Sequence, residues 1–127
     1  MSRENNAYET VSGLPSFSIV VTCYNLEKYI GEALDSCCKQ VYDGEWEVIV
    51  VEDCSNDKSR DVIQQYLAEH PAARVRLVPR ETNGGVAAAT DTGVAAAKHE
   101  WIAIADGDDV QLPDRLTKAA KNHPKAS

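Results

Sequence analysis

Three carboxylates stand within four positions near the end of the chain, in the stretch "IADGDDVQLP" (residues 104–113). Asp106, Asp108 and Asp109 follow directly on a hydrophobic run. Like charges at this spacing raise one another's pKa values unless a positive charge lies among them. Carboxylate oxygens are the ligands that Mg²⁺ and Mn²⁺ prefer. The spacing alone leaves two interpretations open: a metal site, or a solvated acidic loop before a helix that Pro113 would begin.

Polar, aromatic and glycine residues also follow the other hydrophobic runs. Asp53 could accept a hydrogen bond from a base N–H or simply form a turn, and Asp57 suits a helix N-cap. Tyr24 could stack on a planar ring or pack in the core. Gly84 and Gly85 precede an alanine-rich stretch, where they could admit a phosphate or allow close helix packing. Cation, phosphate, base acceptor and aromatic together favour a metal-bridged nucleotide, although neither a G-x-G-x-x-G fingerprint nor a P-loop is present.

Hydrophobic periodicity predicts the elements that position these residues. Apolar runs predict buried strands at 17–22, 46–51 and 101–105, and an alternating run predicts a more exposed strand at 74–78. Helical spacing predicts four helices: about 26–39 with Asn25 as its cap, Asp57 to Pro71, 83–98, and one from Pro113 with Leu116, Ala119 and Ala120 facing inward. The alternation predicts an α/β fold, a doubly wound and mostly parallel sheet with helices on both faces. Ligands bind such sheets at the carboxyl ends of the strands, where the polar residues gather.

Composition sets the outer limits of function. The 127 residues, 43% of them hydrophobic, are enough for about one domain. With 13 basic and 20 acidic residues the net charge is −7, which argues against a nucleic-acid or anionic-membrane surface. The polar residues 1–16 are expected to form a flexible leader rather than a secretion signal, which predicts a cytoplasmic protein. The spacing of the four cysteines does not match a zinc site and favours reduced thiols: Cys23, Cys37, Cys38 and Cys54.

Four segments, in their order and spacing, resemble the nucleotide-binding half of family 2 glycosyltransferases, which have the Rossmann-like GT-A fold. They are "SIVVTCYNLEKYIGEALDS", "EVIVVEDCSNDKS", "NGGVAAATDTG" and "IAIADGDDVQLPDRL", and the similarity runs from about residue 17 to 122. The resemblance implies an enzyme that uses Mn²⁺ or Mg²⁺ to bind a nucleotide diphosphate sugar, commonly a UDP-sugar. Such an enzyme transfers the sugar to an acceptor hydroxyl, usually with inversion.

The same resemblance implies a role for each matching residue. Thr22 and Tyr24 would line the nucleoside pocket, Asp53 would receive the base, and Asn83 and Gly85 would lie near the donor. In the D-x-D element, Asp108 would ligate the metal directly, Asp106 would reach the ribose or the metal, and Asp109 would be a supporting carboxylate.

The chain departs from the family pattern at several positions. Glu52 replaces the first acid of the usual Asp-Asp pair, while Cys23 and Cys54 stand where Pro or Ala and Gly are common. Thr90 and Asp91 replace the usual Arg-Asn, which removes a positive charge near the phosphates and leaves donor affinity or identity open.

We expect residues 17–127 to be the donor-binding half of a longer enzyme. The family's acceptor site and its catalytic base have no counterpart before Ser127, so the fragment should be inactive alone. The full-length enzyme would act on a saccharide or lipid-linked saccharide and could do so at the inner face of the membrane. The alternative is a nucleotide-binding module without catalysis.

Overall fold

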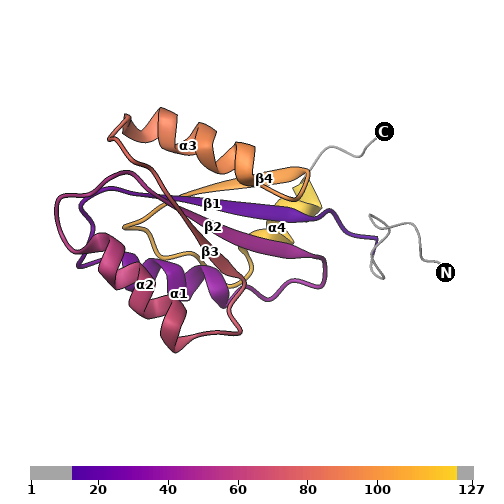
Figure 1. Cartoon of the computed structure of the whole chain (residues 1–127). Helices are drawn as coiled ribbons and strands as arrows, with labels where there is room; N and C mark the ends of the chain where they lie inside the picture. The colour runs from indigo at the N-terminus through magenta and orange to yellow at the C-terminus, as the bar shows by residue number, and fades with distance from the viewer. Residues whose placement is uncertain (1–12, 123–127) are drawn as a thin grey trace.

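The sheet is parallel throughout the part of the chain that the structure describes. The structure is a computed structural model that describes residues 13–122 (Figure 1). Four strands form the sheet, in the order β3-β2-β1-β4: β1 (Phe17–Cys23), β2 (Trp46–Glu52), β3 (Val75–Pro79) and β4 (Trp101–Asp106). Each strand lies within one residue of its predicted bounds. The predicted doubly wound α/β fold is therefore confirmed.

Helices cover both faces of this sheet, as predicted (Figure 1). The helices are α1 (Ile30–Cys38), α2 (Ser59–Glu69), α3 (Gly85–Ala96) and α4 (Arg115–Asn122). On one face, α1, α2 and α4 share a hydrophobic core that includes Leu34, Ile63 and Leu116. On the other face, α3 is the one helix of residues 13–122 that packs against β1 and β2.

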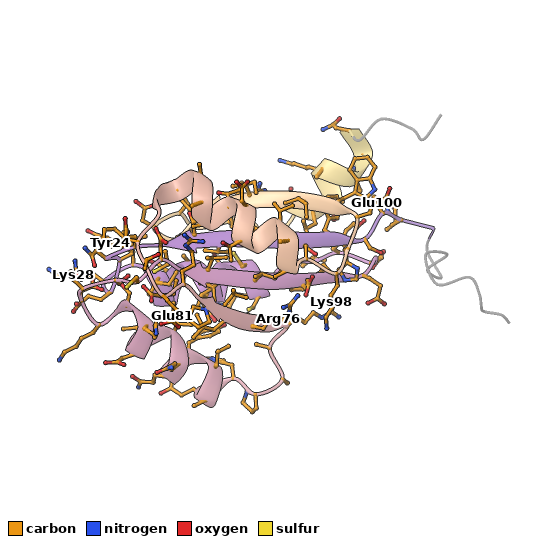
Figure 2. All side chains as sticks on the ribbon, turned by 45° about the horizontal axis from the view of Figure 1, so that its top comes forward. Tyr24, Lys28, Arg76, Glu81, Lys98 and Glu100 are labelled. Atoms are coloured by element: carbon orange, nitrogen blue, oxygen red, sulfur yellow. The ribbon has the colours of Figure 1, made fainter. Side chains whose placement is uncertain are left out.

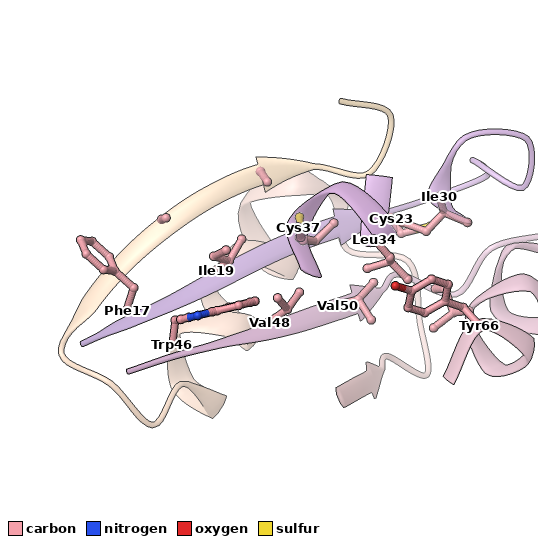
Figure 3. Close-up of a cluster of buried hydrophobic side chains, with 14 of the residues drawn as sticks. Phe17, Ile19, Cys23, Ile30, Leu34, Cys37, Trp46, Val48, Val50 and Tyr66 are labelled. Carbon is pink, nitrogen blue, oxygen red and sulfur yellow. The ribbon is translucent and has the colours of Figure 1, made fainter. Parts of the chain in front are cut away.

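The two central strands are buried on both faces, which is why their sequences are continuous β-branched runs rather than alternating ones. Alternate residues of each strand enter different cores. Figure 3 shows the larger core, in which Ile19 and Val48 of the central strands join Leu34 of α1 and Tyr66 of α2. The smaller core joins Val20 and Ile49 to Ala89 of α3. Each fully buried Val or Ile contributes about 1.5–3 kcal/mol relative to an exposed one.

The fourth strand is not the buried strand that its sequence predicts. β4 lies at the edge of the described sheet, and Ile104 is 43% exposed. The reason is the strand order, because α3 covers β1 and β2 and leaves part of β4 open. A run of apolar residues cannot distinguish a central strand from an edge strand.

Two helix starts also differ from the prediction. Asn25 has a left-handed backbone (φ 54°), so it cannot be the N-cap of α1, which starts at Ile30 after a turn. The start of α2 is closer to expectation. Lys58 occupies its N-cap position, but the Asp57 carboxylate accepts the Ser59 N–H at 2.8 Å and so takes the capping role that the sequence predicts.

The inward residues of the last helix are confirmed. Leu116 is fully buried, and Ala119 and Ala120 pack against the larger core. The helix begins at Arg115, two residues after Pro113.

The predicted leader lies partly outside the described residues, because residues 1–12 are not described. Its last residues are hydrogen-bonded to the rest of the protein. The Pro15 carbonyl accepts the Tyr42 hydroxyl, and the Ser16 carbonyl accepts the Trp101 N–H.

The four cysteines are free, as predicted, and burial raises the pKa of Cys23 to about 11 and that of Cys37 to about 12. None of the described helices has the length and apolar character needed to cross a membrane.

Candidate nucleotide-sugar site

A pocket of about 380 Å³ opens at the carboxyl ends of β1, β2 and β4 and the start of α3. The structure brings all seven of the predicted nucleotide and metal residues into its wall: Thr22, Tyr24, Asp53, Asn83, Gly85, Asp106 and Asp108. They come from four separate segments of the sequence. Parallel strands bring these segments together because their carboxyl ends share one edge of the sheet.

The acidic loop after β4 forms a compact carboxylate cluster. Asp106, Asp108 and Asp109 each offer an oxygen, and these oxygens lie within 4.8 Å of one another on exposed side chains. Asp106 and Asp108 also line the pocket, whereas Asp109 is not among the lining residues. Three hard oxygen donors at this separation fit a divalent cation such as Mn²⁺ or Mg²⁺. The cluster therefore has the donors that the metal interpretation requires.

Gly107 allows this loop to turn into the pocket. Its N–H donates to the Thr22 carbonyl at 2.8 Å. A Cβ atom at this position would lie 2.7 Å from that carbonyl oxygen, so only glycine fits without a shift. The glycine between two aspartates at a strand end was the sequence signal for this close approach, and the sequence interpretation did not use it.

Asp53 is buried, and its carboxylate is fully engaged within the protein. Its oxygens accept hydrogen bonds from Arg80 Nε (2.7 Å), Gly85 N (2.9 Å), and the Asn83 Nδ2 and Gly84 N groups (3.2 Å each). Burial opposes ionisation, but the N–H donors of Gly84 and Gly85 and the Arg80 guanidinium outweigh it and hold the pKa of Asp53 below its usual range. Arg80 is a partner that sequence reasoning missed.

Tyr24 forms an exposed wall of the pocket. Its side chain is 41% exposed, which excludes the alternative of a core aromatic. Asn56 Nδ2 donates to the Tyr24 hydroxyl at 3.2 Å, and Asn56 N donates to Asn25 Oδ1 at 2.8 Å. These bonds join the β1–α1 loop (residues 24–29) to the β2–α2 loop (residues 53–58). A ring held in this way can stack on a planar group without first losing much freedom.

Glu52, the replacement for the family's first acid, is fully buried and does not line the pocket. Its Oε1 atom accepts Arg60 Nε at 2.9 Å and its Oε2 atom accepts Ser55 N at 2.7 Å. Glu52 thus anchors the β2–α2 loop from its buried side. A glutamate, which is longer than the aspartate usual at this position, can still make this contact.

The apolar part of the wall was not predicted. It consists of Cys23, Leu26, Val86 and Ala89. The sequence signal for these apolar residues was that they lie close in the sequence to predicted site residues. Thr90 and Asp91 do not line the pocket, and Asp91 is exposed.

The pocket wall carries three carboxylates and, among the described residues, no basic side chain. Such a wall repels an anion unless a cation lies between them. A cation at the carboxylate cluster would offset this repulsion.

The sequence of the chain is similar to those of known glycosyltransferases. The glycosyl transferase family 2 model matches residues 18–126. The succinoglycan biosynthesis protein ExoO of Rhizobium meliloti is 37% identical over 109 residues, which cover 85% of this chain and 30% of ExoO. The glycosyltransferase GlyG of Streptococcus pneumoniae is 38% identical over 93 residues, which cover 73% of this chain and 30% of GlyG. The chain thus spans less than a third of these two relatives.

Solved structures of glycosyltransferases are also similar to this chain. Residues 1–349 of S. aureus TarS, in complex with UDP-GlcNAc, have a TM-score of 0.73 at 34% identity, over 84% of this chain and 30% of that TarS chain. The mannosyltransferase PcManGT from Pyrobaculum calidifontis, in complex with GDP-Man and Mn²⁺, has a TM-score of 0.75 at 30% identity, over 84% of this chain and 31% of PcManGT. With its motifs, its fold and the match over nearly its whole length, the chain belongs to glycosyl transferase family 2.

Proposed function

We propose that this chain binds the nucleotide diphosphate sugar, a UDP-sugar, of a metal-dependent glycosyltransferase. The observation that carries the proposal is the pocket itself, which is lined by Tyr24, by the loop Asn83–Gly85 and by two members of the carboxylate cluster, Asp106 and Asp108. The nucleotide sugars in the TarS and PcManGT structures support it. The proposal places the protein in the cytoplasm, in keeping with its free cysteines, of which Cys23 and Cys37 are buried.

The nucleoside would lie between Tyr24 and the loop Asn83–Gly85, near Thr22. The diphosphate would then point toward Asp106 and Asp108 at the opposite wall of the pocket. Asp108 and Asp106 would hold Mn²⁺ or Mg²⁺, with Asp109 in support. A bound cation would act as a Lewis acid that stabilises the negative charge on the departing nucleoside diphosphate.

The whole enzyme would use this donor to glycosylate a saccharide or lipid-linked saccharide with inversion. The acceptor hydroxyl would attack the anomeric carbon from the face opposite the diphosphate, and a base would take its proton. That base is expected beyond Ser127. Because general-base catalysis is typically worth ~10²–10⁴-fold, the isolated chain should bind the donor and transfer little sugar.

We propose donor binding without catalysis as the behaviour of this chain by itself. A normal enzymatic turnover by the purified chain would contradict this part of the proposal.

Calorimetric titration of UDP, with and without Mn²⁺, tests the site. We expect Mn²⁺ to strengthen UDP binding at least tenfold and Asp108→Asn to remove most of this gain, because a metal ligand that keeps its shape but loses its charge binds a cation far more weakly. Asp61→Asn, the same change at an exposed position on α2, is the matched control and should behave as the wild type. Binding that ignores both the metal and Asp108→Asn would reject the site.

A further inference from the structure

The acidic loop, residues 107–114, leads from the pocket back along the molecule to α4. In Figure 2, the yellow helix α4 lies toward the end of the molecule that carries Glu100, whereas Tyr24 marks the pocket end. At the start of the loop, the Gly107 N–H is bonded to the end of β1, and two pocket carboxylates flank this glycine. The course of the loop beyond them therefore depends on what holds its other end.

Gln40 holds that other end with both atoms of its side-chain amide. Its Nε2 donates to the Leu112 carbonyl at 2.6 Å, and its Oε1 accepts the Leu116 N–H at 3.0 Å. The side chain is only 8% exposed, and an apolar side chain in its place could make neither bond. Beside it, the Val41 N–H donates to the Pro113 carbonyl at 2.8 Å. One buried residue thus fixes the last part of the loop and the first turn of α4 together.

Arg115, the first residue of α4, closes the acidic loop across its base. Its Nη2 donates to the Ile104 carbonyl at 2.8 Å, and its Nη1 donates to Gln111 Oε1 at 2.6 Å. Ile104 precedes the acidic residues and Gln111 follows them. The Gln111 N–H in turn donates to Ser36 Oγ of α1 at 2.9 Å. A planar guanidinium suits this bridge, because two bonds from one rigid group fix both partners relative to each other.

The carboxylate cluster lies between these two sets of contacts. Asp108 and Asp109 are exposed, and the Asp109 N–H donates within the loop to the Asp106 carbonyl at 3.1 Å. Mn²⁺ and Mg²⁺ bind oxygen ligands at short and narrowly defined distances, so the carboxylates must converge. Exposed carboxylates keep such an arrangement when the backbone beneath them is held by supporting hydrogen bonds. Gln40 and Arg115 make such bonds at the far end of this backbone.

We propose that Gln40 and Arg115 are positioning residues of the cation site, which hold the acidic loop so that the carboxylates of Asp106 and Asp108 converge on a divalent cation. Neither positioning residue lines the pocket, so neither acts by contact with the nucleotide. This inference rests on the proposed function, because it concerns how the same site takes up its metal ion. The alternative is that the two residues only stabilise the fold by fastening α4.

The test combines hydrogen exchange without ligand, electron paramagnetic resonance of free Mn²⁺, and calorimetric titration of UDP with and without Mn²⁺. The variants are Gln40→Met, which keeps a side chain of similar length but neither hydrogen bond, and Arg115→Lys, which keeps the charge but not the planar fork. The matched control is Tyr42→Phe. It removes the hydrogen bond to the Pro15 carbonyl from the same connection between α1 and β2, and this bond does not reach the acidic loop.

Hydrogen exchange of the metal-free chain measures the loop directly. We expect both site variants to speed exchange of the Asp109 and Gln111 amides by about fivefold, because each variant loses hydrogen bonds that fix the loop. Amides of β1 and β2 should stay protected, which shows that the variants are folded. Tyr42→Phe should leave exchange of the loop amides as in the wild type.

Both site variants should weaken Mn²⁺ binding by about tenfold, the effect typical of residues that orient metal ligands. UDP affinity without Mn²⁺ should stay within about twofold of the wild type. A loss of stability alone would not separate metal-dependent from metal-free binding in this way. A purely electrostatic role of Arg115 predicts otherwise as well, because Arg115→Lys keeps the positive charge and would leave Mn²⁺ binding unchanged.

Mn²⁺ binding as in the wild type in both variants would overturn the inference and assign Gln40 and Arg115 to the stability of the fold alone. Unchanged exchange of the Asp109 and Gln111 amides in both variants would overturn it as well. Should Gln40→Met not fold, Arg115→Lys carries the test. If the wild-type chain binds neither Mn²⁺ nor UDP, the proposed function fails, whereas the exchange measurement still decides whether the two residues hold the loop.

Discussion

The backbone N–H of Gly107 donates a 2.8 Å hydrogen bond to the carbonyl of Thr22. This bond joins the acidic loop after β4 to the end of β1, and it places Asp106 and Asp108 on either side of the point where the two backbones meet. The position of the carboxylate cluster relative to the pocket therefore depends on a contact that leaves no room for a side chain at residue 107.

Gly107→Ala should lower the free energy of unfolding by about 1–3 kcal/mol, since overpacking against backbone forces a shift. It should also weaken the Mn²⁺-dependent part of UDP binding, because the shift displaces Asp106 and Asp108. Urea denaturation and calorimetry measure the two effects. Gly31→Ala, inside α1, is the matched control: its Cβ would make an ordinary contact of 3.7 Å with Val62 of α2, and it should be neutral or stabilise the fold.

Cys54→Gly should stabilise the protein. Cys54 has a left-handed backbone (φ 59°), which costs a residue with a side chain about 1–2 kcal/mol. Glycine removes that cost but adds entropy to the unfolded chain and loses the weak contact from Sγ to the Glu81 carbonyl at 3.4 Å. We expect a net gain of about 0.5–1 kcal/mol in urea denaturation. A loss of stability would show that the thiol contact matters more than the backbone strain.

The strands and the edge of the sheet that carries the site could be predicted because both follow from local pattern and parallel topology. The backbone conformation of Asn25 and the partners of Asp53 were not predicted, because both depend on contacts between residues far apart in the sequence. Asn25 adopts its left-handed backbone next to hydrogen bonds with Ser55 and Asn56, thirty or more residues away, so nothing near it in sequence reveals it. The partners of Asp53 likewise come from a loop about thirty residues further on.

The exposure of β4 was beyond prediction for a similar reason. Whether an apolar strand is central or at an edge depends on strand order, which is a property of the whole sheet. The polar residues that line the pocket, in contrast, were all predicted, because polar side chains at successive strand ends can be recognised without knowing the strand order.

Thr90 and Asp91, which stand where the family usually has Arg-Asn, are expected to affect UDP binding differently. Asp91 is exposed and does not line the pocket, so Asp91→Asn should leave UDP affinity within about twofold of the wild type. Thr90 lies one helical turn after the pocket residue Val86, and side chains on a helix point back toward its amino end. Thr90→Arg should therefore bring a positive charge to the pocket and strengthen UDP binding about fivefold, as expected from a partly exposed charge pair worth up to about 1 kcal/mol.

Calorimetry at two salt concentrations checks this prediction. The gain from Thr90→Arg should shrink at high salt, because exposed charge pairs are screened. A gain that Thr90→Gln reproduces would show that side-chain length, and not charge, is responsible.

The stability of the fold should depend on pH through Glu47, which lies far from the pocket. Burial works against ionisation of this carboxylate, but the Ser18 hydroxyl, the Lys98 N–H and Arg76 together hold its pKa below the usual range. Because the unfolded chain then binds the proton more readily, the contribution of Glu47 is complete above the ordinary glutamate pKa of about 4.3 and is lost as the pH falls toward the folded value. Glu47→Gln should lower the unfolding free energy by about 1–3 kcal/mol at pH 7. This difference should shrink steadily between about pH 5 and pH 3. Urea denaturation at pH 7, 5, 4 and 3 measures it, with exposed Glu100→Gln as the control. A difference between wild type and Glu47→Gln that stays constant over this range would show that Glu47 stabilises the fold through its shape and not its charge.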